Sequence, residues 1–135
     1  MVEIDLPEVV EEVTAAFADY EAAIMGNDAD GLIEKFWAHP KTIRYGLGEN
    51  LHGIDEIITF RRAQASAGGY FARRLVRTVI TTYGHDFATA STTYVRDADG
   101  RQGRQMQTWL RTPEGWRVVA AHVSLLPVNL ALNVG

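Results

Sequence analysis

The chain has 135 residues, of which 47% are hydrophobic and 22% are charged, and its formal net charge is −4. A chain of this length builds one core, so we expect a single domain over residues 1–135. The negative charge argues against general nucleic-acid binding, which depends on clustered lysine and arginine to neutralise phosphates. The sequence has no cysteine, which excludes disulfides, thiol catalysis and cysteine-based metal sites.

The N-terminal segment is acidic and lacks the basic stretch and apolar run of a signal peptide. No apolar stretch is long enough to span a bilayer. We therefore expect a cytoplasmic protein with no membrane contact.

Helical periodicity dominates the first half of the sequence. Asp5 and Glu8 have the spacing of a capping box and predict a first helix that ends at Gly26. Its apolar residues recur at steps of three and four, which is typical of one buried stripe. They are Val10, Val13, Phe17, Tyr20 and Ile24.

Two further helices are predicted. Asp28 is expected to cap a short helix that Pro40 ends, because a proline disfavours the α conformation of the residue before it. A β-prone run over residues 42–45 and a loop over 46–50 follow. A third helix is expected to begin near Gly53 and to break at residues 67–69.

From about residue 71 the hydrophobic period changes to two, which indicates strands. Four strands are predicted, over residues 74–83, 87–96, 102–112 and 116–125. Helices that precede an antiparallel meander indicate the α+β class. We expect three N-terminal helices packed on a curved antiparallel β-sheet, with a conical pocket between them.

Two parts of the sequence resemble a known family. Residues 103–111 and 114–124 resemble the last two strands of SnoaL-like and NTF2-like domains, which often end in a tryptophan-rich strand and a His-x-Ser. Residues 78–90, together with the Ala-Ala-His-Val-Ser ending at Ser124, resemble the AtzH/HpxZ group of this superfamily.

The resemblance implies an NTF2-like cone and a small accessory protein. Relatives are associated with the catabolism of acyl ureas such as oxalurate and carboxylated biuret, and AtzH-type proteins are similar to a non-catalytic subunit of an amidase-signature amidase. The wider superfamily also contains isomerases, dehydratases and cyclases, so the fold alone does not decide the function. The alternative is a small SnoaL-like lyase, hydrolase or isomerase that uses a pocket histidine.

Side chains alternate along a strand, so His122 and Ser124 should share one face and look into the pocket near its mouth. Because imidazole exchanges protons near neutral pH, His122 is the candidate acid or base of any reaction, with Tyr45 or Ser124 beside it. The competing interpretation is a core histidine that hydrogen-bonds to a neighbouring hydroxyl.

Polar groups that bind a ligand are also predicted. Gln105 and Gln107 share one strand face and can hydrogen-bond an amide or a carboxylate, or they form a polar face of a dimer-forming sheet. Arg44 and Arg61 are expected to point inwards and to pair with a carboxylate of the protein or of a ligand. The predicted pocket residues are therefore Arg44, Tyr45, Arg61, Gln105, Gln107, His122 and Ser124.

No metal and no cofactor are expected. His39, His52 and His85 lie in loops or turns and lack the spacing of metal ligands, and no glycine-rich phosphate loop follows a strand. The expected ligand is a small carboxylate or amide.

The C-terminal tail is unusually apolar for a chain end. We expect it to pack on the outer face of the sheet, on a second copy of the chain, or on a partner enzyme. Its large apolar residues are Leu125, Leu126, Val128, Leu130, Leu132 and Val134. The expected partners are a second copy in a homodimer and an amidase-signature enzyme.

Overall fold

The computed structural model describes residues 1–68 and 72–128. These residues form three helices and six strands, of which all three helices and five strands were predicted. The long strands come last, as expected. The elements are α1 (Pro7–Met25), α2 (Ala29–Glu34), β1 (Ile43–Tyr45), β2 (Asn50–His52), α3 (Ile54–Ser66), β3 (Arg73–Tyr83), β4 (Phe87–Arg96), β5 (Gln102–Thr112) and β6 (Gly115–Leu125).

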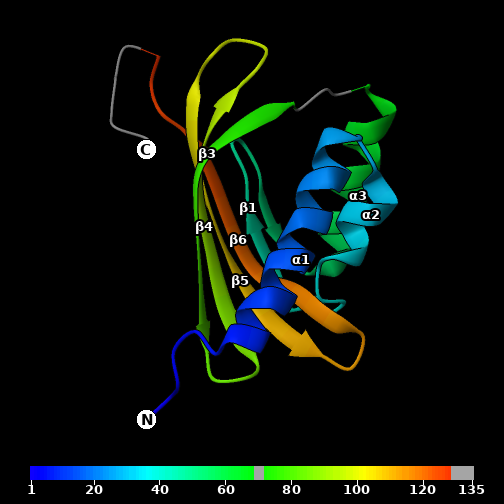
Figure 1. Ribbon diagram of the computed structural model, residues 1–135. Helices are drawn as coiled ribbons and strands as arrows, with labels where there is room; N and C mark the ends of the chain where they lie inside the picture. Colours follow the sequence, from blue (N-terminus) through cyan, green and yellow to red (C-terminus); the bar gives the residue numbers. More distant parts are fainter. Residues whose placement is uncertain (69–71, 129–135) are drawn as a thin grey trace.

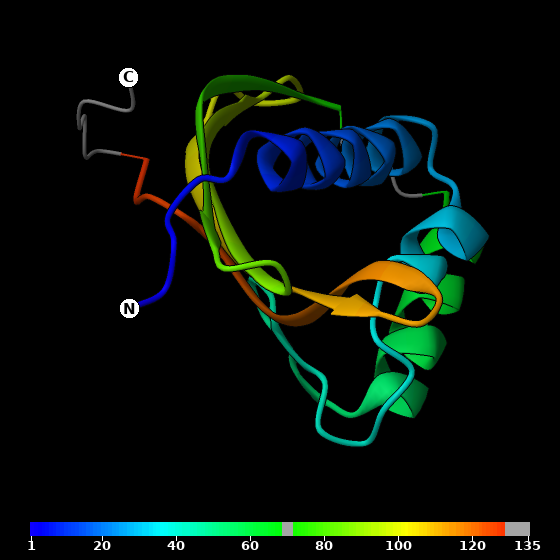
Figure 2. The same cartoon turned by 60° about the horizontal axis from the view of Figure 1, so that its bottom comes forward.

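The strands form one sheet in the order β2-β1-β6-β5-β4-β3. It curves around one side of α1 without closing, and α2 and α3 lie at the open side of the curve (Figures 1 and 2). The expected α+β class, with helices on a curved sheet, is confirmed. The sheet is not antiparallel throughout, because β1 pairs in parallel with β6. The sequence did not predict β2, because Asn50, Leu51 and His52 include no β-branched residue and begin inside the predicted loop.

The core lies between α1 and the concave face of the sheet, which we call the inner face. The α1 side chains that pack there include Val13, Phe17 and Tyr20. Tyr20 meets Phe36 and Trp109 edge to face, with ring centroids 6.2 and 6.5 Å apart. The predicted helical stripe is therefore buried except at its first position, where Val9 is buried and Val10 is only half-buried.

The start of α1 differs from the prediction. Asp5 does not cap the helix, because the N-cap residue is Leu6 and it has no side-chain capping bond. Instead, Asp5 adopts a positive φ of 58° and its carboxylate accepts a hydrogen bond from the backbone N–H of Thr82 at 2.9 Å. The capping-box prediction was wrong because a contact with β3, distant in sequence, uses the same carboxylate.

The starts of the other helices agree with the prediction. The Asp28 side chain accepts a hydrogen bond from the backbone N–H of Gly31 at 3.0 Å and so caps α2. Gly53 precedes α3 with a φ of 88°, a conformation that favours glycine. However, α2 ends before the proline predicted to stop it, because the backbone of residues 35–37 bonds to that of Val118.

A β-bulge interrupts the pairing of β5 with β6. Thr108 pairs with Ala120 and Trp109 pairs with Val118, so Val119 has no partner. An unpaired extra residue reverses the direction of every side chain beyond it relative to a regular strand. The second half of β6 therefore presents the opposite set of residues to the inner face.

No helix among the described residues is both long and apolar enough to cross a membrane.

Candidate functional site

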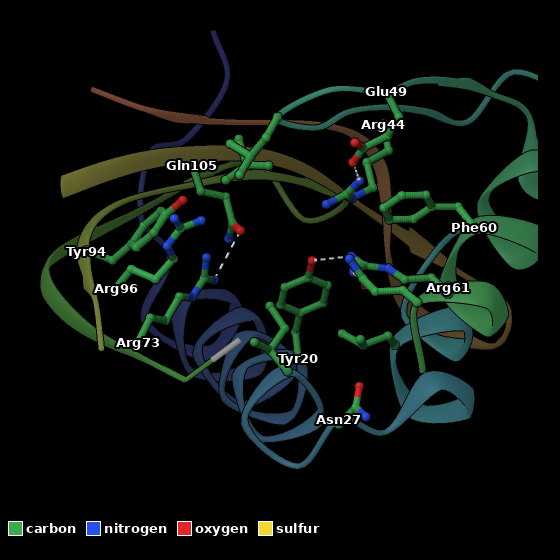
Figure 3. A pocket seen from close by; sticks show the side chains of 15 residues that line it. Tyr20, Asn27, Arg44, Glu49, Phe60, Arg61, Arg73, Tyr94, Arg96 and Gln105 are labelled. Atoms are coloured by element: carbon green, nitrogen blue, oxygen red, sulfur yellow. Dashed lines mark hydrogen bonds and ion pairs between the residues drawn. The ribbon is translucent and has the colours of Figure 1, made fainter. Parts of the chain in front are cut away.

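A cavity of about 150 Å³ lies between the C-terminal half of α1, α3 and the inner face of the sheet (Figure 3). Its apolar wall includes Ile24, Leu32, Phe60 and Val123. Its charged wall carries four arginines and one carboxylate, namely Arg44, Arg61, Arg73, Arg96 and Glu49. The cavity thus combines an apolar wall with an excess of guanidinium groups.

Arg61 of α3 is buried, with 5% of its surface exposed. One terminal nitrogen donates to the Tyr20 hydroxyl at 3.1 Å, and the other donates to Oε1 of Gln64 at 3.2 Å. Its Nε has no partner among the described residues, and it forms no ion pair with any of their carboxylates. Burial lowers the pKa of Arg61, because removal from water disfavours the charged form.

Arg44 of β1 is buried beside Arg61 and has its own counter-ion. Its Nη1 donates to Oε1 of Glu49 at 2.6 Å, and its guanidinium lies 5.1 Å from the centre of the Phe60 ring. The other oxygen of Glu49 accepts a hydrogen bond from the backbone N–H of Gly48 at 3.1 Å. Both Glu49 oxygens are therefore held in the loop between β1 and β2.

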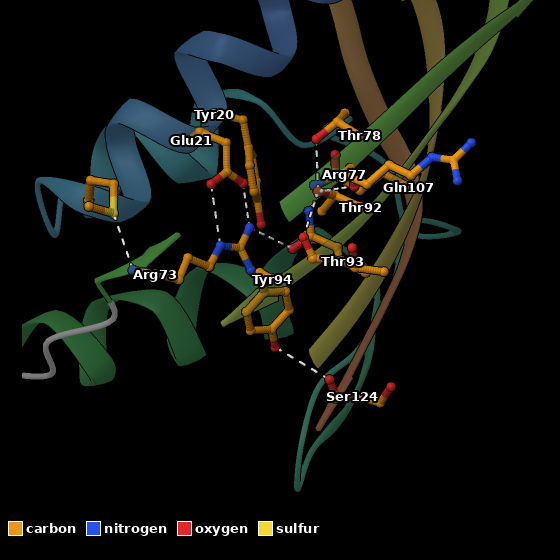
Figure 4. Close-up of polar contacts among 12 residues, drawn as sticks. Tyr20, Glu21, Arg73, Arg77, Thr78, Thr92, Thr93, Tyr94, Gln107 and Ser124 are labelled. Atoms are coloured by element: carbon orange, nitrogen blue, oxygen red, sulfur yellow. Dashed lines mark hydrogen bonds and ion pairs between the residues drawn. The ribbon is translucent and has the colours of Figure 1, made fainter. Parts of the chain in front are cut away.

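Arg73, at the start of β3, also has a carboxylate partner that neutralises its positive charge. It forms an ion pair with Glu21 of α1 and lies over the Tyr94 ring (Figure 4). It also donates to Oε1 of Gln105 at 3.1 Å (Figure 3). Burial acts to lower the pKa of Arg73, but the hydrogen bond and charge of Glu21 outweigh it and raise the pKa. Burial raises the pKa of Tyr94, and the nearby Arg73 opposes this shift.

Gln105 is 4% exposed and its orientation is defined by Arg73. A guanidinium only donates hydrogen bonds, so the atom of Gln105 that faces it must be the carbonyl oxygen. The amide nitrogen then has no acceptor among the described residues. The cavity wall therefore presents one buried amide donor that lacks a partner.

Three predicted pocket residues line this cavity: Arg44, Arg61 and Gln105. Gln107 is buried on the same face, but it lies deeper and its carbonyl accepts a hydrogen bond from the Trp109 indole at 3.1 Å. It does not line the cavity.

His122, Ser124 and Tyr45 lie on the convex face of the sheet, which we call the outer face. His122 pairs with Met106, which is 60% exposed, and directly paired residues point to the same side. The expectation that His122 and Ser124 look into the pocket was wrong, because the bulge at Val119 reverses the alternation before it reaches them.

The outer face has a shallow groove of its own, with a volume of about 250 Å³. Tyr45 and His122 meet edge to face there, with ring centroids 6.0 Å apart, and Ile43 and Met106 flank them. These side chains lie across the sheet from Arg61 and do not belong to the arginine-lined cavity.

Sequence reasoning did not include Glu49, Gln64, Arg73 or Tyr94 among the predicted pocket residues. Glu49 lies in a predicted loop, where a carboxylate is ordinarily a solvated side chain. Its pairing with Arg44 was detectable only as an opposite charge five residues away. Among the described ranges, no cluster of three or more histidine, aspartate or glutamate residues is placed to hold a metal ion.

The sequence matches the AtzH-like family over residues 2–129. The chain belongs to the AtzH-like family. This confirms the AtzH/HpxZ resemblance that was based on residues 78–90 and on the ending at Ser124. The AtzH-like chain matches no curated protein.

Solved structures agree with this assignment. The AtzH-like chain is 56% identical to a protein of unknown function from Pectobacterium atrosepticum, with a TM-score of 0.86 over 92% of this chain and 95% of that one. It is 45% identical to a cystatin-like fold protein from Burkholderia xenovorans, with a TM-score of 0.85 over 95% and 99% of the two chains. An NTF2-like family protein from Streptomyces avermitilis shares the fold at 20% identity, with a TM-score of 0.76 over 88% and 97% of the chains.

Proposed function

We propose that this AtzH-like protein binds a small carboxylate in the arginine-lined cavity and acts as a non-catalytic accessory protein. The observation that carries the proposal is Arg61, a buried guanidinium that lacks a carboxylate partner among the described residues. Burying an uncompensated charge costs several kcal/mol, so such groups are ordinarily paired. A ligand carboxylate would supply the missing charge and accept hydrogen bonds from the guanidinium.

The size of the cavity supports a small ligand. A protein cavity of about 150 Å³ admits benzene, which has six heavy atoms. The cavity has a similar volume and opens to solvent, so it suits a ligand of about six to eight heavy atoms. This range includes short carboxylic acids that also carry an amide group.

The positions and pairing of the carboxylates and of His122 favour a non-catalytic role. The carboxylates of Glu49 and Glu21 each hold an arginine, so neither is positioned as a free general base. His122, which motivated the enzyme alternative, lies on the outer face and has no access to a ligand bound at Arg61. Neither these two carboxylates nor His122 therefore supports the enzyme alternative at the cavity.

The partner we propose is an amidase that acts on acyl-urea-like metabolites. Support comes from the AtzH-like family membership together with a cavity suited to small molecules that contain carboxylate and amide groups. Co-expression with an amidase-signature enzyme of the source organism, followed by size-exclusion chromatography with light scattering, tests this part. A complex of the two chains supports it, whereas separate elution of both at micromolar concentration contradicts it.

We also propose that the outer face is the interface of a homodimer. It exposes Val79, Phe87 and Met106, and apolar surface of this kind usually marks a contact between proteins. Most of the tail lies outside the described residues; of the described part, Leu126 is buried and Val128 is exposed. A monomeric mass in light scattering contradicts the dimer.

Calorimetric titration with malonamate, which carries one carboxylate and one amide, tests ligand binding. The Arg61→Met variant is expected to weaken binding at least about tenfold, because the ligand loses its charged partner. Its free energy of unfolding should be unchanged or higher by about 1 kcal/mol, because an apolar side chain replaces a buried charge. Arg62, exposed on the same helix, provides the control: Arg62→Met should bind as the wild type does.

The proposal fails if wild-type protein binds neither malonamate nor other carboxylates of similar size. It also fails if the folded Arg61→Met variant retains full affinity, since the ligand would then bind without the guanidinium.

A further inference from the structure

Among the described residues, carboxylates neutralise the positive charge of every arginine that lines the cavity except one. Three of them form ion pairs: Arg44 with Glu49, Arg73 with Glu21, and Arg96 with Asp99. The fourth, Arg61, is bonded only to the neutral groups of Tyr20 and Gln64 within the described part of the chain. The described lining and its immediate partners therefore leave one uncompensated positive charge.

The loop between β1 and β2 holds the Glu49 carboxylate in position as the counter-ion of Arg44. A Cβ at Gly46 would lie 1.7 Å from Oε1 of Glu49, so only a glycine leaves room for the carboxylate to fold back onto Arg44. The backbone N–H of Gly48 holds the second oxygen. The Glu49 and Arg44 side chains are only 23% and 10% exposed, so water screens this pair less than a pair on the open surface.

Gln105 supplies the second recognition element. Its carbonyl oxygen is used by Arg73, and its buried amide nitrogen lacks an acceptor among the described residues. Figure 3 shows Gln105 and Arg61 on either side of Tyr20. A ligand that spans the cavity meets a cation at one end and a neutral donor at the other. A carbonyl oxygen satisfies this donor.

We infer that Glu49 sets the charge of the ligand. By holding Arg44, it leaves Arg61 as the one guanidinium of the described lining without a carboxylate partner, so the site takes a monocarboxylate whose other end is a neutral amide-type carbonyl. This inference rests on the proposed carboxylate binding and narrows it to one ligand class. A second ligand carboxylate in place of the amide would find no unpaired guanidinium among the described residues of the lining, because Glu49 holds Arg44 and Glu21 holds Arg73. Its charge would then be partly buried without a counter-ion, which is unfavourable.

The test is calorimetric titration with three ligands of one skeleton: malonamate with one charge, malonate with two, and malonamide with none. It is done at about pH 7.5, where carboxyl groups of ordinary pKa are ionised. Wild-type protein is expected to bind malonamate about tenfold more tightly than malonate, with malonamide weaker than both. The Glu49→Gln variant should reverse the order and prefer malonate by about tenfold, because Arg44 then lacks a counter-ion.

Two further variants sharpen the test. Gly46→Ala keeps the Glu49 charge but displaces the carboxylate from Arg44, and should also raise the affinity for malonate relative to malonamate. Glu34→Gln removes a carboxylate that pairs with Arg117 outside the cavity, and should leave the wild-type order unchanged.

The outcomes separate the two proposals. If wild-type protein binds malonate as tightly as malonamate, or if Glu49→Gln leaves their ratio unchanged, the charge inference is overturned while carboxylate binding stands. If the wild type binds none of the three ligands or any similar carboxylate, carboxylate binding and the charge inference fail together.

Discussion

The inner and outer faces of β5 differ sharply although they are built from alternate residues of one strand. Gln105, Gln107 and Trp109 are buried on the inner face, whereas Met106 is 60% exposed between them. On β6 the same division holds, but the bulge at Val119 exchanges which residues belong to each face. A bulge of one residue therefore decides whether His122, the histidine of β6, faces the cavity or the opposite surface.

The largest expected difference between the faces is in stability. Trp109→Ala should lower the free energy of unfolding by about 3–5 kcal/mol, because Trp109 is fully buried and packs against Tyr20. Met106→Ala should change it by no more than about 0.5 kcal/mol in the isolated chain. Urea denaturation of both variants measures the contrast, and equal losses would contradict the assignment of these residues to different faces.

A smaller effect is expected where β5 begins. Gly103 lies on the inner face, and a Cβ there would approach Cζ of Tyr94 to 2.2 Å. Gly103→Ala should therefore displace the Tyr94 ring and lower the free energy of unfolding by about 1–3 kcal/mol, as overpacking does. Because Tyr94 lines the cavity, malonamate affinity should fall as well. Denaturation and calorimetry test this, and wild-type values for both would show that the ring has room to move.

The smallest expected effect is at His122. His122→Ala should leave malonamate affinity within about twofold of the wild type and stability within about 0.5 kcal/mol, because the side chain is exposed on the outer face. Calorimetry and urea denaturation provide the measurements. A large loss of binding would place the histidine at the ligand and restore the interpretation based on unbroken strand alternation.

Most of the secondary structure could be predicted from the sequence. The four long strands were predicted within one residue at each end, because alternating β-branched residues and glycine-containing turns are local signals. The inward direction of Gln105 and Gln107 was also predicted, since the inner face of β5 alternates without interruption through these positions. The inward direction of Arg61 was predicted as well, and the residue is buried on α3.

Other features depended on contacts between distant residues. Asp5 bonds to Thr82, and α2 ends where residues 35–37 meet Val118, so the local capping and proline signals did not decide the outcome. Arg73 entered the cavity because Glu21, which is 52 residues away, forms its counter-ion. Periodicity carries no information about such pairs.

The sequence by itself determined the family, the α+β class and the alternation of β5, because these follow from short-range patterns of side chains. Only the tertiary structure decided that His122 faces outwards, that Glu49 neutralises Arg44, and that Arg61 remains without a carboxylate among the described residues. The physical reason is the same in each case. A bulge shifts a whole strand face by one residue, and ion pairs form between side chains that folding brings together.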